Sequence, residues 1–442
     1  MNELTETAAP HTSGLVDRIR RLPILAPLRY RDFRLVWFGE SISLFGDQFH
    51  YVALSWLVLG LTGSGLALGT VLLAAALPRG VFLLVGGALS DRISPRTLML
   101  GSNVIRAVIT TIVAALVLGG RIEIWHLVIA GALFGTVDAV FFPAIGTIVA
   151  RLVPPDRLGP ANAVLQGTQQ LMHTVGPALA GFAIAIIGVG AAFVVDAASF
   201  GVAALAIFLV RTVGIPTGSV PPDPATDLVS VDEAPESPGP APRPSVLTEM
   251  IAGARAVLGD PVLRMLVLLS TSFNLAFTGP VVVGLPWLVQ VRFGGDAAML
   301  GLVFAAFGGG SLLGILLVEM VQRTRGLGGV LIAIAVLLGV GLAAIGLAPA
   351  PIVGPICFLI GCGTGYLNVS IITWTQARTE PHLLGRTMSF LMLGSVVGAP
   401  LSLAVAGAVV DIEATALFLG AGALVVATAL AGLATSLPRR MV

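Results

Sequence analysis

The stretch GGALSDRISPRTLML, residues 86–100, places a short charged turn between two long apolar segments. These segments, at about 65–89 and 97–119, are each long enough to cross the roughly 30 Å hydrocarbon layer of a membrane. The whole chain shares their character, because 56% of its 442 residues are hydrophobic, 11% are charged and the mean hydropathy is +0.98. This composition excludes an ordinary soluble domain and predicts an integral membrane protein.

Apolar segments of similar length recur along the whole chain and predict an all-α membrane protein with twelve transmembrane helices. The predicted spans are 34–60, 65–89, 97–119, 124–150, 160–188, 190–211, 262–291, 297–320, 329–348, 351–377, 384–410 and 412–436. An even number of spans puts both termini on one side of the membrane. The first thirty residues are polar and rich in Arg, so we expect no cleaved targeting segment.

The basic residues are all Arg, and they gather in the loops on one side of the predicted bundle. Only Arg121 and Arg292 fall in the opposite loops. The loops of the first side carry Arg92, Arg96, Arg151, Arg157, Arg323, Arg325, Arg378 and Arg386. Because short positively charged loops stay in the cytoplasm, the sequence predicts a multi-pass protein of the cell membrane with both termini cytoplasmic.

The composition also divides the chain into two six-helix bundles that are separated by a linker. The predicted segments are a cytoplasmic N-terminal segment 1–33, a bundle 34–211, a cytoplasmic linker 212–261, a bundle 262–436 and a tail 437–442. Residues 212–247 contain nine Pro and no aromatic residue, and such a stretch cannot form a packed core. The stretch that follows, 246–260, has apolar residues at helical spacing and predicts an amphipathic helix on the membrane surface.

The two predicted bundles resemble each other at an offset near 230 residues. GALFGTVDA (131–139) aligns with GCGTGYLNV (361–369), and SWLVLGLTGS (55–64) aligns with PWLVQVRFGG (286–295). The matches occur in the same order in both halves, so the chain is predicted to be a duplicated six-helix unit. In transporters built from such repeats the substrate site lies between the two halves.

The turn at 86–100 resembles the cytoplasmic signature of the major facilitator superfamily, although Ser94 and Pro95 depart from it. The matching residues are Gly87, Asp91, Arg92 and Arg96. The resemblance implies a two-bundle transporter in which this Asp and its Arg partners form a conformational latch between the halves. The alternative for the same residues is a plain loop that orients the chain and caps the next helix.

The N-terminal half resembles the macrolide-efflux and enterobactin-exporter branch of that superfamily. The stretches that carry this resemblance are SLFGDQF (43–49), ALSWLVLGLTGS (53–64), ALPRGVF (76–82), GGALSDR (86–92), DAVFFPA (138–144) and LVPPDRLGPANA (152–163). In addition, GPALAG (176–181) is similar to the Gly-Pro motif of proton-coupled exporters. The resemblance implies a single-chain antiporter that exports amphipathic small molecules, such as drugs or secondary metabolites, in exchange for protons. We expect a monomer, and we expect no enzyme, because no nucleophile, base and oxyanion set is placed together.

Charged residues inside the predicted spans are the candidates for proton coupling, because a charge at the centre of a membrane helix costs about 2.5–3.5 kcal/mol. These candidates are Glu40, Asp47, Arg79, Arg106 and Asp138. Counting depth at about 1.5 Å per residue predicts that Asp47 pairs with Arg79. In the same way, Asp138 is predicted to pair with Arg106. We expect protonation of a carboxylate to release its Arg; a static salt bridge is the alternative for each pair.

The acids of the N-terminal half have different expected roles. Glu40 lies seven residues before Asp47 on nearly the same helix face, and is either a relay for Asp47 or its solvated neighbour. Asp196 lies near the outer end of its span, where a structural hydrogen bond is expected. At the aligned positions of the other half stand Thr271 and Thr278, so acidity is confined to the N-terminal half.

A polar stripe and a set of aromatic residues predict the substrate cavity. The predicted cavity residues are Gln166, Gln170 and His173, spaced i, i+4 and i+7, with Asn274, Asn368 and Trp374 in the other half. An apolar wall is predicted from Phe45, Phe49, Phe273 and Phe277. For each aromatic residue, packing between helices is the alternative.

The sequence predicts no metal site, cofactor or nucleic-acid partner. Neither His50 nor His173 has a carboxylate or Cys at ligand spacing on its own helix, and no nucleotide-binding signature is present. The expected partners are a small-molecule substrate, protons and the lipid bilayer. Two alternatives stay open, a dedicated exporter of one siderophore or lipid and a non-transporting membrane sensor or scaffold.

Overall fold

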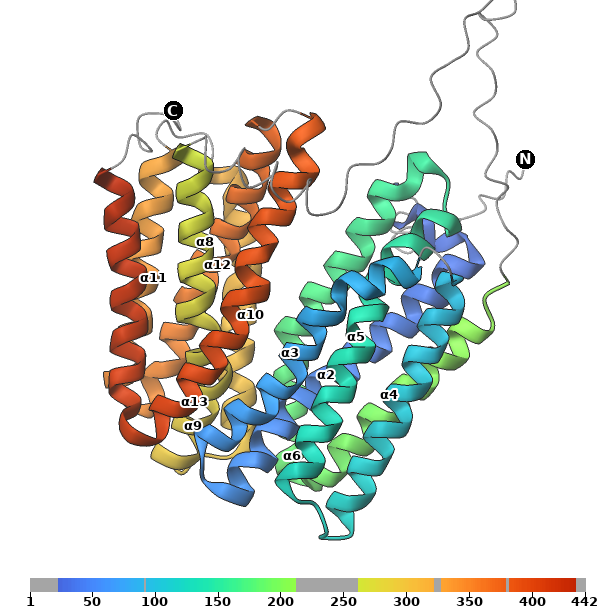
Figure 1. Cartoon of the computed structure of the whole chain (residues 1–442), viewed down its shortest axis with the longest axis horizontal. Helices are drawn as coiled ribbons and strands as arrows, with labels where there is room; N and C mark the ends of the chain where they lie inside the picture. The colour runs from blue at the N-terminus through green and yellow to red at the C-terminus, as the bar shows by residue number, and fades with distance from the viewer. Residues whose placement is uncertain (1–22, 91–92, 212–260, 322–326, 379–380, 435–442) are drawn as a thin grey trace, which may run out of the picture.

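The computed structural model describes residues 23–90, 93–211, 261–321, 327–378 and 381–434. These residues form two helical bundles that stand side by side (Figure 1). The first, which we call the N-half, consists of η1 (Pro23–Arg29), α2 (Arg31–Thr62), α3 (Gly65–Ser90), α4 (Pro95–Leu118), α5 (Ile124–Leu152), η2 (Pro155–Arg157) and α6 (Leu158–Phe208). The second, the C-half, consists of α8 (Pro261–Gly279), η4 (Pro280–Gly284), α9 (Leu285–Trp287), η5 (Leu288–Arg292), α10 (Ala297–Val321), α11 (Leu327–Leu347), α12 (Ala350–Arg378) and α13 (Pro381–Ala434).

The number of spans follows from helix length. Within the described residues nine helices are long and apolar enough to cross a membrane. Two of them, α6 with 51 residues and α13 with 54, are about twice as long as one span requires. Each contains a residue with non-helical backbone angles, Gly188 in α6 and Glu413 in α13. Counting these two helices twice and adding the more charged α2 gives the twelve predicted spans.

The reversal of α6 at Gly188 is visible in its contacts with α2. A Cβ added at Gly46 would overlap the side chain of Ser199, and one added at Gly176 would overlap that of Gln48. Ser199 and Gly176 lie on opposite sides of Gly188 in the sequence. The two arms of α6, the first before Gly188 and the second after it, therefore both pack beside the middle of α2. The φ of 82° at this turn is a left-handed conformation that glycine adopts without strain.

The predicted duplication appears as one helix contact made twice. In the N-half, a Cβ added at Gly135 of α5 would overlap the carbonyl oxygen of Ala75 in α3. In the C-half, a Cβ added at Gly365 of α12 would overlap the carbonyl oxygen of Ser311 in α10. Gly135 and Gly365 stand at aligned positions of the repeat, so the same close backbone approach joins the second and fourth helices of each half.

We expect Gly365→Ala to destabilise the C-half by about 1–3 kcal/mol, because the added methyl group forces α10 away from α12. Gly354→Ala, in the same helix, is the matched control, since nothing lies within 4 Å of a Cβ there. Thermal unfolding of the purified protein in detergent measures both changes. Equal midpoints for the two variants would show that the backbone contact at Gly365 does not limit packing.

The two halves approach each other on one side of the molecule. We call the side where α2 begins and α6 ends the termini side, and the side where α2 ends and α3 begins the far side. The halves converge at the far side and spread apart at the termini side (Figure 1). A Cβ added at Gly69 would lie 3.0 Å from the Cα of Gly407, and one added at Gly181 would lie 2.9 Å from the Cα of Gly301. Glycine thus allows α3 to touch α13 and α6 to touch α10.

A carboxylate on the far side also binds one half to the other. The side chain of Asp411 in α13 accepts hydrogen bonds from Ser64 Oγ (2.7 Å), Gly65 N (2.6 Å), Leu66 N (3.0 Å) and Trp287 Nε1 (3.0 Å). Gly65 and Leu66 begin α3, where backbone N–H groups have no partner within the helix. Asp411 of the C-half therefore caps a helix of the N-half.

Parts of the predicted organisation lie outside the described residues. They include the linker and amphipathic helix at 212–260, the tail 437–442 and residues 1–22 of the N-terminal segment. The fold class itself is confirmed, because the described residues form an all-helical membrane protein of two bundles.

Candidate functional site

Arg106 of α4 and Asp138 of α5 form the ion pair that the depth count predicts. Arg106 Nη2 donates to Asp138 Oδ1, and the Arg106 side chain is only 5% exposed. Its guanidinium group also stands 4.3 Å from the ring centroid of Phe141 and 5.7 Å from that of Phe200. The charge is therefore held by one carboxylate and two aromatic faces in the interior of the N-half.

Arg79 of α3 lies beside Asp138, so the predicted pair of Asp47 with Arg79 is wrong. The Nη1 atom of Arg79 is 4.0 Å from Oδ2 of Asp138. The reason is the close approach of α3 and α5 at Ala75 and Gly135, which lie about one turn from the two charged residues. The prediction used only the depth of each charge along its helix. Depth does not indicate that α3 packs against α5 more closely than against α2.

Glu40 and Asp47 lie on α2, in the same charged region of the N-half. Glu40 is 4% exposed and its Oε1 has no hydrogen-bond partner among the described residues. This burial excludes the solvated alternative for Glu40. Asp47 is half-buried, and its charged neighbours include Arg106 and Asp138. These charged side chains therefore link α2 to the ion pair between α4 and α5.

A second buried pair joins α2 to α6 and was not predicted from the sequence. His50 Nδ1 lies 2.9 Å from Asp196 Oδ2, and the side chain of Asp196 is completely buried. The imidazole ring packs between Phe134, at 5.0 Å between centroids, and Phe193, at 5.5 Å. The hydrogen bond expected for Asp196 is present, and its partner is an ionisable side chain.

The interior of the N-half carries more acidic than basic groups. The buried and half-buried groups are four carboxyl groups, one guanidinium group and one imidazole, which belong to Glu40, Asp47, Asp138, Asp196, Arg106 and His50. The more exposed guanidinium group of Arg79 lies beside Asp138. Ionisation of all four acids would leave net negative charge in the interior, which is costly away from water. A group of this composition can bind and release protons.

The predicted polar stripe lies on the first arm of α6. Gln166 and His173 are exposed and Gln170 is half-buried. The Nδ1 atom of His173 is 3.4 Å from Nε2 of Gln48 in α2. A Cβ added at Gly308 of α10 would lie 2.8 Å from the carbonyl oxygen of His173, so the stripe reaches the C-half there.

The predicted cavity residues of the C-half lie on α8 and α12. Asn274 donates from Nδ2 to the carbonyl oxygen of Ser270 within its own helix, at 2.8 Å. On α12, Asn368 is exposed and Trp374 is half-buried. Asn368 is thus not packed into the core, whereas the Asn274 amide already has one partner.

The predicted apolar wall is divided between the halves. Phe45 and Phe49 pack edge to face at 5.1 Å between centroids, and Phe273 and Phe277 stack at 4.8 Å. Phe49 belongs to the hydrophobic core that continues from the N-half into the C-half, and the other three rings pack against that core. Helix packing therefore accounts for part of this aromatic surface.

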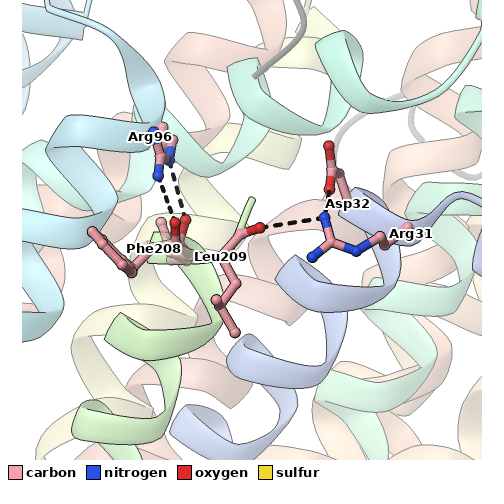
Figure 2. A network of polar contacts seen from close by, with 6 residues as sticks. Arg31, Asp32, Arg96, Phe208 and Leu209 are labelled. Atoms are coloured by element: carbon pink, nitrogen blue, oxygen red, sulfur yellow. Dashed lines mark hydrogen bonds and ion pairs between the residues drawn. The ribbon is translucent and has the colours of Figure 1, made fainter. Parts of the chain in front are cut away.

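The carbonyl end of α6 is held on the termini side by two Arg side chains (Figure 2). Arg96 of α4 donates from Nε to Ile207 O at 3.2 Å and from Nη2 to Phe208 O at 2.5 Å. Arg31 of α2 donates to Leu209 O at 3.4 Å. Cations near the C-terminus of a helix stabilise its free carbonyl groups. Arg96 therefore fixes α4 to α6 inside the N-half.

The rest of the predicted latch is only partly described. Gly87 belongs to α3, and Asp91 and Arg92 lie outside the described residues. Ser94 Oγ accepts a hydrogen bond from Thr97 N at 3.2 Å and so caps α4. The helix cap of the plain-loop alternative is therefore present, while the latch role of the signature stays a prediction.

Together, the fold and the interior charges define a multi-pass α-helical membrane protein built from two related bundles. Residues 36–403 match the family model of the Major Facilitator Superfamily. Since this match spans most of the 442 residues, the chain belongs to the Major Facilitator Superfamily, a family of transporters and not of enzymes.

Two relatives with curated descriptions are similar over most of their length. The multidrug efflux pump Tap of Mycolicibacterium fortuitum is 27% identical over 386 residues, which cover 85% of this chain and 88% of the relative. The macrolide efflux protein A of Streptococcus pyogenes is 23% identical over 370 residues, which cover 83% and 85%. Both similarities are distant, and they relate the chain to efflux proteins without fixing its substrate.

Solved structures show the same fold at lower identity. The nucleoside transporter NupG has a TM-score of 0.68 and 14% identity, covering 91% of this chain and 98% of its own. A bacterial homologue of the iron transporter ferroportin, in an inward-facing state, has a TM-score of 0.67 and 15% identity, covering 92% and 99%. At this identity the similarity supports the architecture alone.

Proposed function

We propose that this chain is a proton-coupled antiporter that exports amphipathic small molecules, such as drugs or secondary metabolites, across the cell membrane. The observation that carries the proposal is the excess of buried and half-buried carboxyl groups over guanidinium groups in the N-half. Such groups hold a proton in one state and lose it in another, so cargo and proton can compete for the same transporter.

The two efflux relatives support the direction of transport. Both are named for export, one of several drugs and the other of macrolides. With both termini in the cytoplasm, the far side faces outward, and the contacts that join the halves there correspond to a state closed to the outside. Opening the far side and closing the termini side would complete the export cycle.

Within this function, Asp47 and Asp138 are the proposed proton carriers and Glu40 a relay. Arg106 and Arg79 both lie beside Asp138, so protonation of that carboxylate would loosen two cations at once. The structure pairs no cation with Asp47 at salt-bridge distance within the described part of the chain, which leaves this acid available for a proton.

We expect Asp47→Asn to abolish transport against a gradient while cargo binding is retained, because the amide keeps the shape but cannot carry a proton. Proteoliposomes with an imposed pH gradient test this with erythromycin, tetracycline and ethidium as probes. Asp156→Asn is the matched control, since that side chain is 69% exposed and lies outside the interior. Undiminished gradient-driven accumulation in Asp47→Asn would remove Asp47 from the mechanism.

The two alternatives differ in measurable ways. A dedicated exporter of one siderophore or lipid should answer to a single chemical type when a broad panel of unrelated compounds is tested. A membrane sensor or scaffold should show no flux with any compound and should lose a protein partner when residues 216–244 are deleted. The relatives named for drug and macrolide efflux favour the broader exporter.

A further inference from the structure

The pair of His50 and Asp196 has no role in the mechanism described so far. Asp196 is completely buried, and its Oδ1 has no hydrogen-bond partner among the described residues. A buried ionised carboxylate needs a counter-charge, and His50 at 2.9 Å is the ionisable group in contact with it. The pair is therefore most stable with one proton between the imidazole and the carboxylate.

The charged groups around the pair do not supply another counter-charge. The charged groups that act on His50 are Asp196 on α6, Asp47 on α2 and Asp138 on α5, all acidic. Arg106 on α4 is already bound by Asp138, and so is Arg79 on α3 at 4.0 Å. His50 is therefore the basic group that remains in contact with Asp196.

A small cavity touches His50 on the far side of the pair. Its lining consists of His50, Leu54, Val113, Leu127, Ala130, Gly131, Phe134 and Phe193. Leu54 is one turn beyond His50 toward the far end of α2, and Leu127 is in the first turn of α5, which begins on that side. The imidazole is the only polar side chain in the lining, so the cavity leaves the far-side face of His50 unpacked.

The titratable groups of α2 follow one another across the molecule. Glu40, Asp47 and His50 stand in this order from the termini side to the far side, and the steps of seven and three residues keep them near one helix face. His50 is the member next to the far-side cavity. Asp47, three residues earlier, has both Arg106 and Asp138 among its charged neighbours.

We propose that the His50 and Asp196 pair is the far-side proton-binding site of this transporter, which takes up a proton from the far side and passes it to Asp47. The proton binds the imidazole, with the Asp196 carboxylate as its counter-ion. On transfer, the imidazole becomes neutral and the Asp47 carboxylate becomes a carboxylic acid. The inference rests on the proposed proton coupling and assigns its point of entry.

The test uses Asp196→Asn and His50→Gln in proteoliposomes, with erythromycin, tetracycline and ethidium as probes. Asparagine can still accept a hydrogen bond from the imidazole, so a merely structural contact would survive this change. We expect accumulation driven by a pH gradient to fall at least about 10-fold, as for the loss of a proton-transfer group. Exchange of labelled for unlabelled probe without a gradient should stay within about 2-fold, because it requires no net proton transfer.

A pH profile separates the proposed role from a general loss of activity. In the unaltered protein, gradient-driven transport should depend on far-side pH, and both variants should lose that dependence. His126→Gln is the matched control, because this imidazole also lies on the far side, at the start of α5, but hydrogen-bonds to the backbone of Glu123. It should keep the pH profile of the unaltered protein.

Full gradient-driven transport in Asp196→Asn would overturn the proposal and leave the pair as a structural contact. If the unaltered protein itself accumulates no probe under a pH gradient, the proposed function fails rather than this inference. Where a single variant does not fold, His50→Met with Asp196→Leu replaces the pair by apolar groups. Coupled transport by that double variant, or misfolding of all three variants, would also overturn the proposal.

Discussion

Replacing Asp138 by Leu is expected to lower the free energy of unfolding by about 3–5 kcal/mol, because it leaves a buried guanidinium group without its carboxylate. Arg106 is 5% exposed, so water cannot take over the role of the lost partner. The aromatic faces of Phe141 and Phe200 remain, but a cation–π contact is worth only about 0.5–2 kcal/mol.

Adding Arg106→Met to Asp138→Leu should recover most of this loss, since well-packed apolar groups replace a buried ion pair at little cost. Arg79→Met is the milder comparison, because that side chain is 49% exposed and 4.0 Å from Asp138, and it should cost less than about 1 kcal/mol. Unfolding in detergent measures all three variants. A double variant as unstable as Asp138→Leu alone would contradict this account.

The same double variant separates a static salt bridge from a coupling site. If the pair of Arg106 and Asp138 only fixes packing, the stable double variant should still accumulate probe under a pH gradient. We expect it instead to fold and bind cargo but to transport only downhill, because the carboxylate that would take the proton is gone. Gradient-driven accumulation equal to that of the unaltered protein would assign the pair to structure alone.

The second large effect is expected at Asp411, whose carboxylate holds the halves together on the far side. Asp411→Ala removes the cap of α3, and loss of such a cap costs about 0.5–2 kcal/mol, or roughly a 2- to 30-fold shift between two states. Because the carboxylate is exposed, we expect the lower part of this range. The shift should favour the state in which the far side is open.

The opening of the far side can be measured as the distance between two spin labels, one at Arg121 of the N-half and one at Leu347 of the C-half. For this experiment Cys357 and Cys362 are replaced by Ala. Asp411→Ala should increase the fraction of molecules with a long distance between the labels. Asp296→Ala is the matched control, because its carboxylate also caps a far-side helix, α10, but in its own half. An equal shift in both variants would show that the effect is loss of a cap and not loss of the link between halves.

The helices were predictable because the bilayer imposes one simple rule on length and polarity. The predicted boundary between 160–188 and 190–211 falls at Gly188, where the chain reverses. Depth along a span was also predictable, since each residue adds a fixed rise, and this placed Arg106 level with Asp138. The aligned glycines Gly135 and Gly365 likewise make the equivalent contacts that a duplication requires.

The depth of a charge did not predict its partner where the rotation of the helices and the order in which they pack determine which side chains meet. Arg79 and Asp47 have equal depth on consecutive helices, yet Arg79 contacts Asp138, because Gly135 brings α5 onto α3. In the same way, depth alone does not bring His50 and Asp196 together, because they lie on separate spans. Gly46, four residues before His50, lets Ser199 approach closely, and these two small residues are the sequence signal for that contact.

The sequence by itself determined the twelve apolar spans, the duplicated halves and the depth of each charge, because these follow from hydrophobic length and helix rise. Only the tertiary structure decided which charges are in contact, since a helix can place any of its faces against any neighbour. Small residues determine where two helices approach each other most closely. The tertiary structure therefore paired His50 with Asp196 within the N-half, and Asp411 with the start of α3 across the two halves.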